Sequence, residues 1–251
     1  MPRQARIKSR SGIYHIMLRG INRQIIFEDD EDKKRFVDTL LKYKHNYYLF
    51  AYCIMDNHVH VLLKETSEPL SDLIKRISSS YVYWYNMKYN RCGHLFQARF
   101  KSENVETKAY FLTVLRYIHQ NPLKAGLVKD VFQSRWTSIH EYCKNERPLD
   151  IELPLNLFSN NKTRAVTLFK EYMSESTYDL CLEDPPSQRI TDDEVRIYLR
   201  KLGVSNKSML QGMNKEQRNE VLVNLKTLKG VSERQISRVT GVSRKVIQKV
   251  R

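Results

Sequence analysis

The stretch Leu49-Phe-Ala-Tyr-Cys-Ile-Met-Asp-Asn-His-Val-His-Val-Leu-Leu-Lys64 decides the fold class. Two runs of strand-forming residues flank a turn signal, Asp56-Asn57, and so predict a tight β-hairpin. Because side chains alternate along a strand, His58 and His60 share one face while the intervening apolar side chains point into the core. Two adjacent imidazoles are part of a ligand set for a divalent metal. Two exposed histidines on a solvated sheet face explain the pattern equally well.

The predicted elements on either side of the hairpin indicate an α+β fold. A strand, a helix, the hairpin, a second helix, an extended segment and a third helix are predicted at residues 13–19, 29–47, 49–64, 67–90, 93–105 and 107–125. This order predicts a ferredoxin-like antiparallel sheet with helices on one face, followed by a small all-α C-terminal region. We expect a first domain at residues 1–145, a connecting helix and linker at 146–190 (helix 157–178, linker 183–188) and a helical module at 191–251.

The chain carries a large positive charge. Its 43 Lys and Arg residues stand against 28 Asp and Glu residues, which gives a net charge of +15. Such a surplus favours a polyanionic partner, because contacts to phosphates release counterions. A protein that is merely basic, or one that touches anionic lipid, would show the same charge. A lipid anchor needs a long amphipathic helix with one basic face, which the sequence lacks, so nucleic acid is the favoured partner.

The sequence also bears on the compartment. No apolar stretch approaches the roughly 18 residues of a membrane span, and no apolar segment of a secretory signal follows the basic N-terminus. The four cysteines are isolated in the sequence, a pattern typical of reduced thiols and not of a zinc site or a disulfide framework. These features predict a cytoplasmic protein with no membrane partner.

The helix predicted at residues 107–125 carries a second candidate group. Tyr117 and Asn121 are four residues apart and therefore lie on the same helix face. A phenol beside an amide is an unusual pair for a core-facing surface, although an Asn that ends the helix before Pro122 is the ordinary alternative. If this face packs on the histidine strand, one pocket holds two imidazoles, an amide and a phenol.

Several sequence blocks, in a fixed order over roughly residues 10–142, carry a family resemblance. They are Tyr14-His-Ile16, Arg19-Gly-Ile-Asn-Arg23, Met55-Asp-Asn-His-Val-His-Val-Leu62, Gly93-His-Leu-Phe-Gln-Ala-Arg-Phe-Lys-Ser102, Arg116-Tyr-Ile-His-Gln-Asn-Pro-Leu-Lys-Ala-Gly-Leu-Val128 and Ser134-Arg-Trp-Thr-Ser138. Together they resemble the REP-associated tyrosine transposases, which are single-tyrosine transposases of the HUH class (His, hydrophobic residue, His). The blocks in order are specific where each one alone would not be.

The resemblance implies roles for individual residues. It makes His58 and His60 ligands of Mg²⁺ or Mn²⁺, with Asn121 as the third ligand at a position where relatives often carry Gln. It makes Tyr117 the nucleophile, which the sequence alone would not single out among 15 tyrosines. Several other tyrosines lie in Tyr81-Val-Tyr-Trp-Tyr85, which either packs in the core or forms a base-stacking surface.

The implied reaction is the nicking and rejoining of single-stranded DNA next to hairpins. A phenol with an ordinary pKa of about 10 is a poor nucleophile at neutral pH, so a metal that polarises the scissile phosphate would lower the barrier at the electrophile. Attack would leave a 5′-phosphotyrosine and a free 3′-hydroxyl, and rejoining would need no nucleotide cofactor. Beside the nucleophile, Arg116 and His119 either assist the reaction or are simply solvated. The candidate DNA contacts of this domain are Arg19, Arg23, Arg99, Lys101 and Arg116.

The C-terminal stretch from Glu233 to Val250 resembles a helix-turn-helix. Gly241 would supply the left-handed turn residue, Ser243 would cap the second helix, and Ile247 would face inward together with Val250. Between positions 229 and 251, seven Lys or Arg residues stand against one Glu. A solvated basic hairpin of helices is the alternative to a surface that contacts double-stranded DNA. The outward residues expected to make that contact are Arg244, Lys245, Gln248 and Lys249.

Three functions fit these features. The first is a strand-transferring transposase, either mobile or domesticated by its host. The second is a non-catalytic DNA-binding regulator, and the third is an HUH relative that nicks DNA for replication or conjugation. The joint presence of His58, His60, Tyr117 and Asn121 favours the first over the second, and the order of the blocks favours it over the third. The resemblance leaves a monomer and a homodimer open, and with them the action of Tyr117 in cis or in trans.

Overall fold

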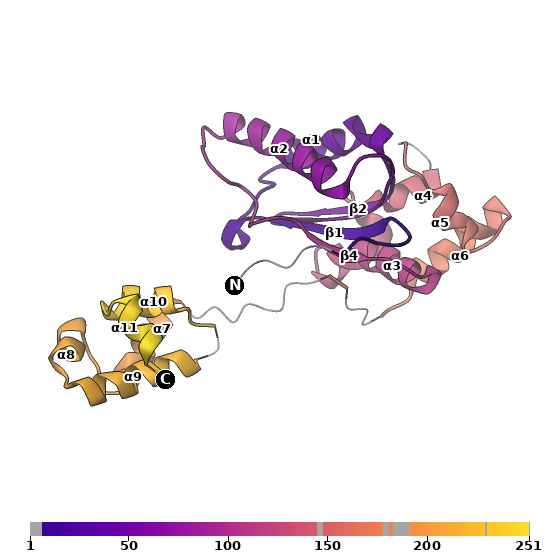
Figure 1. Cartoon of the computed structure of the whole chain (residues 1–251). Helices are drawn as coiled ribbons and strands as arrows, with labels where there is room; N and C mark the ends of the chain where they lie inside the picture. Colours follow the sequence, from indigo (N-terminus) through magenta and orange to yellow (C-terminus); the bar gives the residue numbers. More distant parts are fainter. Residues whose placement is uncertain (1–6, 145–147, 178–180, 183–190, 229, 251) are drawn as a thin grey trace. The chain divides into compact units, whose positions relative to one another are not determined.

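The computed structural model describes residues 7–144, 148–177, 181–182, 191–228 and 230–250. The chain divides into two compact units, Met1–Glu183 and Asp184–Arg251, and each is described by itself. Figure 1 shows the first unit as a sheet with helices and the second as a group of helices.

A four-stranded antiparallel sheet forms the centre of the first unit. Its strands, in the spatial order β2-β3-β1-β4, are β1 (Ile13–Arg19), β2 (Tyr47–Met55), β3 (His58–Glu65) and β4 (Lys101–Asn104). The strand order and the hairpin at Asp56-Asn57 confirm the predicted ferredoxin-like sheet. The extended segment expected at 93–105 forms a strand only at Lys101–Asn104, with an isolated bridge from Phe96 to Gly20, because Gly93 and Ala98 have positive φ angles, which extended strands do not use.

Helices cover both faces of this sheet, so the expectation of helices on one face is wrong in that detail. The helices of the unit are α1 (Asp30–Lys42), α2 (Leu70–Lys88), α3 (Lys108–Lys124), α4 (Glu141–Lys144), α5 (Glu152–Asn156) and α6 (Lys162–Ser174), with 3₁₀ turns at Ile21–Arg23, Lys44–Asn46, Val131–Gln133 and Ser138–His140. Figure 1 shows α1 and α2 on one side of the sheet and α3 on the other. The physical reason is that both sets of alternating side chains in β1, β2 and β3 are buried.

Aromatic residues fill the layer between the sheet and α1 and α2. Phe27 packs edge-on against Phe36 of α1, and both rings contact Tyr81 of α2. The hydroxyl of Tyr81 donates a hydrogen bond to the carbonyl of Ile26. The first residue of the aromatic run is therefore a core residue, while Tyr83 of the same run is 72% exposed.

The connector expected at residues 146–190 does not form a separate piece over its described part. Leu149, Ile151 and Leu155 belong to the core of the first unit, and so does Phe169 of α6, which stacks on Tyr142. The linker expected at 183–188 lies outside the described residues. The structure places the division between the two units at Glu183 and Asp184.

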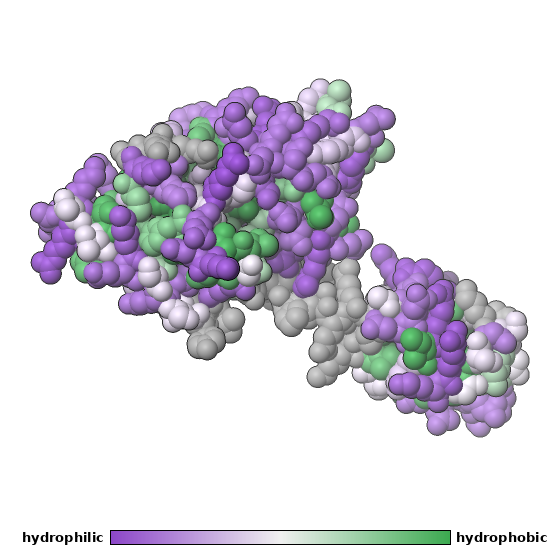
Figure 2. All heavy atoms as spheres, turned by 180° about the vertical axis from the view of Figure 1, so that it is seen from behind, coloured by the Kyte–Doolittle hydropathy of each residue, from purple (hydrophilic) through white to green (hydrophobic). Residues whose placement is uncertain are grey.

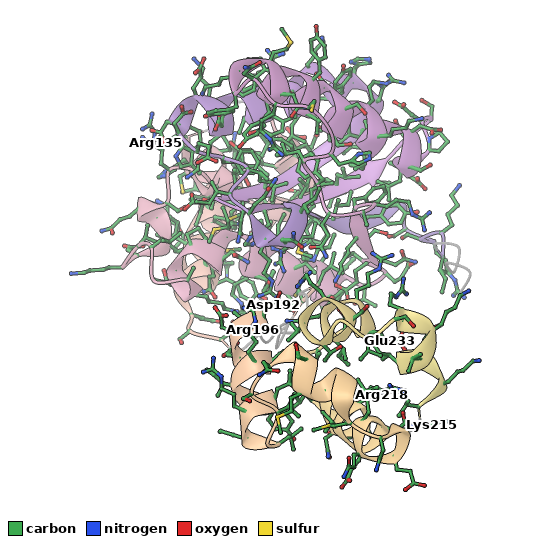
Figure 3. All side chains as sticks on the ribbon, turned by 90° about the vertical axis from the view of Figure 1, so that its left-hand side faces the viewer. Arg135, Asp192, Arg196, Lys215, Arg218 and Glu233 are labelled. Atoms are coloured by element: carbon green, nitrogen blue, oxygen red, sulfur yellow. The ribbon has the colours of Figure 1, made fainter. Side chains whose placement is uncertain are left out.

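The second unit is helical, as expected, and has its own apolar core. Its helices are α7 (Asp192–Lys201), α8 (Lys207–Gly212), α9 (Lys215–Thr227), α10 (Glu233–Thr240) and α11 (Arg244–Lys249). Figure 3 labels Asp192 at the start of α7. The carboxylate of Asp192 forms an ion pair with the guanidinium of Arg238 in α10, at a distance of 2.6 Å. Val195, Leu222 and Ile247 are among the fully buried residues of this core.

The face drawn in Figure 2 is mainly hydrophilic, with apolar side chains in a few groups. None of the described helices combines the length and the apolar character needed to cross a membrane. All four cysteines are free thiols.

Candidate functional site

Cross-strand pairing gathers the polar residues of β1, β3 and β4 on the sheet face that α3 covers. His58 lies opposite Arg19, and His60 lies opposite Met17, which in turn lies opposite Lys101. Residues directly opposite one another in an antiparallel pair point to the same face. The prediction that the two histidines share a face is therefore confirmed, and cationic residues lie on that face beside them.

Helix α3 brings Tyr117 and Asn121 onto this face. The side chain of Thr107 caps the helix by accepting a hydrogen bond from the amide of Tyr110, which fixes where the helix begins. The Tyr117 ring lies edge-on to His60, with centroids 5.5 Å apart. Asn121, one turn later, lies close enough to the His58 side chain to act on the pKa of its ring. The packing on which the one-pocket hypothesis depended is therefore present.

His58 is held as a neutral imidazole with a defined tautomer. Its Nδ1 lies 2.6 Å from Oδ1 of Asn57, while Nδ2 of the same amide donates to the carbonyl of Arg23. Because an amide oxygen can only accept, the proton of the ring is on Nδ1, and Nε2 keeps its lone pair. Burial, the nearby Arg19 and a weaker effect of Arg23 lower the pKa of His58 to about 4.

His60 is almost completely buried, at 1% exposure. Its Nδ1 lies 2.9 Å from Nε2 of His15, and the two rings are 5.0 Å apart. Burial and the neighbouring His15 and His58 hold the pKa of His60 well below its ordinary value. The ring is therefore neutral at physiological pH.

These donors fit a divalent metal in their chemistry. His58 and His60 are neutral, their rings lie 5.0 Å apart, and both have Nδ1 engaged by a neighbour. Imidazole nitrogens and an amide oxygen are ligands that Mn²⁺ accepts. Within the described parts of the chain, no three His, Cys, Asp or Glu side chains come together as a ligand set. A site here would thus depend on the amide of Asn121 as its third protein ligand.

Three cations lie close to the two histidines. Partial burial and the charges of Arg19 and Arg23 lower the pKa of Lys101, so the three side chains influence one another. Arg23 and the preceding Asn22 have positive φ angles of 61° and 54°, which turns the chain back toward the hairpin. The tight approach also requires Gly20, because a Cβ there would lie 2.4 Å from the carbonyl oxygen of Gln24. The loop therefore holds cationic side chains where a DNA phosphate could bind.

Other candidates lie elsewhere. Arg116 is 8% exposed, pairs with Glu175 at 2.8 Å and lies 4.0 Å from the ring centroid of Tyr172, so its guanidinium joins α3 to α6. His119 is fully buried and hydrogen-bonds Ser138. Arg99 is exposed in the loop before β4. A DNA contact by Arg99 or Arg116 stays a prediction, and the ion pair between the buried guanidinium of Arg116 and the exposed Glu175 gives Arg116 a structural role.

Sequence reasoning did not single out Asn57 and His15 as site residues. The Asp56-Asn57 pattern predicts only that Asn57 lies in a turn, although the amide of Asn57 also orients His58. His15 lies in the matching block Tyr14-His-Ile16, but the pairing of β1 with β3 is needed to place it beside His60. Alternation along β1 places His15, Met17 and Arg19 on one face, but the local sequence does not indicate which strand lies next to β1.

Buried neutral histidines make the fold sensitive to acid. Burial lowers the pKa of His119 to about 3, and His58 and His60 are lowered as described above. The unfolded chain, with histidine pKa values near 6.5, takes up protons first. The contribution of these neutral histidines to the free energy of unfolding is therefore complete above pH 6.5, and it is lost as the pH falls toward 4. We expect the urea midpoint of the first unit to fall steadily between pH 7 and pH 5. A midpoint that stays constant over this range would contradict the assignment.

In the second unit, α10 and α11 are joined by residues 241–243. Gly241 has a φ of 77° and is left-handed, as predicted, and Ile247 and Val250 are buried. Ser243 occupies the N-cap position of α11 but makes no side-chain capping hydrogen bond. The four predicted contact residues are exposed, and Gln248 donates to Glu233, the first residue of α10. The exposed residues are Arg244, Lys245, Gln248 and Lys249.

Comparisons with known proteins identify a domain within the first unit. Residues 8–121 match the family described as "Transposase IS200 like". No curated protein matches the chain. A solved structure of a REP-associated tyrosine transposase bound to a REP hairpin is 18% identical, with a TM-score of 0.49, over 60% of this chain and 90% of that one. The family match confirms the resemblance over the residues that it covers and supports a role in DNA transposition.

Proposed function

Since residues 8–121 match the IS200-like transposases, we propose that this protein nicks and rejoins single-stranded DNA through Tyr117. The reaction is a phosphotransesterification that leaves a 5′-phosphotyrosine and a free 3′-hydroxyl. The DNA would carry hairpins beside the cleavage site, as the residue-level resemblance to REP-associated transposases implies. Mobility of an element and a domesticated host function both remain within this proposal.

The observation that carries the proposal is the contact between α3 and the histidine strand. The ring of Tyr117 lies 5.5 Å from that of His60 and 5.8 Å from that of His15. Asn121, the other residue on the same helix face with a predicted role, lies close enough to His58 to act on the pKa of its ring. A regulator that only binds DNA has no need for a phenol, an amide and two oriented neutral imidazoles in one place.

The chain's own residues would divide the chemistry. Arg19, Arg23 and Lys101 would bind the DNA backbone and neutralise its charge. His58, His60 and Asn121 would hold Mg²⁺ or Mn²⁺, and when bound the ion supplies Lewis-acid polarisation of the scissile phosphate. Tyr117 would provide the nucleophilic oxygen, and its proton would leave to solvent or to a neighbouring base.

Burial of Tyr117 sets a condition on this reaction. The side chain is 2% exposed, and the ammonium of Lys124 lies 5.2 Å from its ring centroid. A phosphate can approach the hydroxyl only if covering side chains move. DNA binding therefore has to displace side chains that cover Tyr117, and Lys124, the last residue of α3, is one that contacts its ring.

A covalent-adduct experiment tests the proposal. The full chain is incubated with Mn²⁺ and labelled single-stranded hairpin oligonucleotides, and protein–DNA adducts that resist denaturant are measured. We expect adducts with Mn²⁺ and none with EDTA, and peptide mapping should place the nucleotide on Tyr117. Tight DNA binding with confirmed Mn²⁺ loading but no adduct, on substrates that include the element's own ends, would favour the non-catalytic regulator.

We further propose that the second unit contacts double-stranded DNA through α11. Arg244, Lys245 and Lys249 are exposed on this helix, while Ile247 anchors its other face in the core. This is the arrangement by which a helix presents cations to a groove while it stays attached to its domain.

Alanine at Arg244, Lys245 and Lys249 together is expected to weaken duplex binding by the full chain. Each lost phosphate contact lowers the slope of log K against log salt by about 0.9, so three contacts predict a change of up to roughly 2.7. The matched control removes the same charge from exposed positions on α7 and α9: Arg200, Lys201 and Lys215. Equal losses in both triple variants would show that charge alone, and not the surface of α11, is responsible.

A further inference from the structure

His15 is a buried histidine that has no assigned role in the proposed reaction. It lies in β1, is fully enclosed, and contacts His60 through Nε2 at 2.9 Å. Its other ring nitrogen, Nδ1, has no hydrogen-bond partner within 3.5 Å. Oε2 of Glu103 lies 3.8 Å from this nitrogen. Burying a polar nitrogen in this way costs free energy unless a partner forms a hydrogen bond with it.

Glu103 is held in place to be that partner. It lies directly opposite His15 in the β1–β4 pair, so both side chains occupy the same face. Its carboxylate accepts a hydrogen bond from the amide of Leu182 at 3.2 Å and interacts with the Tyr110 hydroxyl. The interaction with His15 is the main reason that the pKa of Glu103 is lowered, so the group is an ionised acceptor.

The order of these groups determines where each proton lies. Because Glu103 can only accept, the carboxylate 3.8 Å from Nδ1 of His15 favours the tautomer with its proton on Nδ1 and a lone pair on Nε2. A neutral imidazole carries a single N–H, so with the proton on Nδ1 the His15 ring can only accept through Nε2. The hydrogen bond at 2.9 Å then requires His60 to donate from Nδ1. Nε2 of His60 is left with a lone pair, as Nε2 of His58 is.

We propose that Glu103 and His15 form a positioning relay that holds His60 in the orientation and tautomer needed to bind a divalent metal. The inference rests on the proposed function, because it assigns His60 to a metal. Histidine ligands commonly donate their second N–H to an oriented acceptor, and losing such an acceptor costs about 10- to 100-fold in metal affinity. Here a second histidine takes that acceptor position and is itself fixed by a carboxylate. His15 and Glu103 are thus positioning residues that act through His60.

The test compares His15→Phe and Glu103→Gln with the unaltered chain. Phenylalanine keeps an aromatic ring in the buried space but removes the acceptor for His60. Glutamine keeps the shape of Glu103 but removes its charge. Glu106→Gln is the matched control, since Glu106 is a nearby carboxylate that accepts from the Arg10 and Ser11 amides. The readouts are the histidine tautomers from long-range ¹H–¹⁵N spectra of the metal-free protein, Mn²⁺ affinity by calorimetry, and thermal unfolding.

We expect His15→Phe to move His60 to the Nε2–H tautomer and to raise the Kd for Mn²⁺ by roughly 10- to 100-fold. Glu103→Gln should produce a smaller rise in the same direction, and Glu106→Gln should produce none. An unchanged His60 tautomer, or a Kd within about twofold of the unaltered chain in either folded variant, would overturn the relay. If His15→Phe fails to fold, Glu103→Gln decides by the same criteria.

The same experiment separates this inference from the proposed function. Adduct formation by the unaltered chain, together with normal Mn²⁺ binding by His15→Phe, would remove the relay and leave the transposase reaction standing. Absence of Mn²⁺ binding by the unaltered chain would instead overturn the metal site itself, and the relay's role with it. The tautomers would then show only whether the hydrogen bonds exist.

Discussion

Tyr117→Phe is expected to abolish the covalent protein–DNA adduct and to reduce strand nicking by roughly 10⁴-fold or more, because the nucleophilic oxygen is absent. The substitution should leave the fold intact, since a phenylalanine ring retains the edge-on contact with His60 and fills the same buried space. Binding of hairpin DNA should stay within a few-fold of the unaltered protein, because the cationic loop is unchanged. Adduct yield on denaturing gels and DNA affinity measure the two effects separately.

Tyr142→Phe is the control for this substitution. Tyr142 is a buried tyrosine, 2% exposed, whose hydroxyl donates to the carbonyl of Phe50 and not to the candidate site. Its loss costs about 1 kcal/mol of stability, as for one buried hydrogen bond, and activity should persist. If the adduct survives in Tyr117→Phe, another tyrosine is the nucleophile, and the strongly exposed Tyr83 becomes the first candidate.

His58→Ala and His60→Ala are each expected to raise the Kd for Mn²⁺ by at least about 100-fold and to reduce nicking by roughly 10³-fold. Each removes an imidazole whose Nδ1 is already engaged and whose Nε2 is available to a ligand. His60→Ala should also lower stability, because it opens a cavity at a fully enclosed position. Calorimetry with Mn²⁺ and single-turnover nicking give the two quantities.

His45→Ala serves as the control, since His45 is exposed in the 3₁₀ turn before β2. It removes an imidazole without touching the candidate site, so both quantities should stay at the level of the unaltered protein. Normal Mn²⁺ affinity in both site variants would place the metal elsewhere. Normal nicking with reduced Mn²⁺ affinity would show that the ion is dispensable for the chemistry.

The sequence predicted the hairpin and the shared face of His58 and His60 because both follow from local alternation. The spacing of Tyr117 and Asn121 placed them on one helix face for the same local reason. Which strand lies next to His60 depends on contacts 45 residues apart, between β1 and β3. The role of His15 could therefore be found only once the strands were paired.

The extent of the first unit illustrates the same limit. A weak pattern after residue 145 suggested a connector, but Leu149, Ile151 and Phe169 pack into the core. Helix α6 has an apolar side because it covers α3, and the carbonyl of Met173 in α6 accepts a hydrogen bond from Gln120. In a single sequence this side is indistinguishable from that of a helix in a separate module. The covering of both sheet faces does not follow from the sequence, because a strand buried on both faces, such as β2, lacks the alternation that would indicate which side faces the core.

The sheet order β2-β3-β1-β4 puts the strands that carry His15, His58 and His60 in its middle. Amide hydrogens in central strands exchange with solvent only when the whole domain opens. At a free ion concentration of 100 times the Kd, a metal bound by His58 and His60 would add about 2.7 kcal/mol to the free energy of that opening. Occupancy would then slow hydrogen exchange throughout the core of the first unit, and the metal would act as a determinant of how long the folded domain survives.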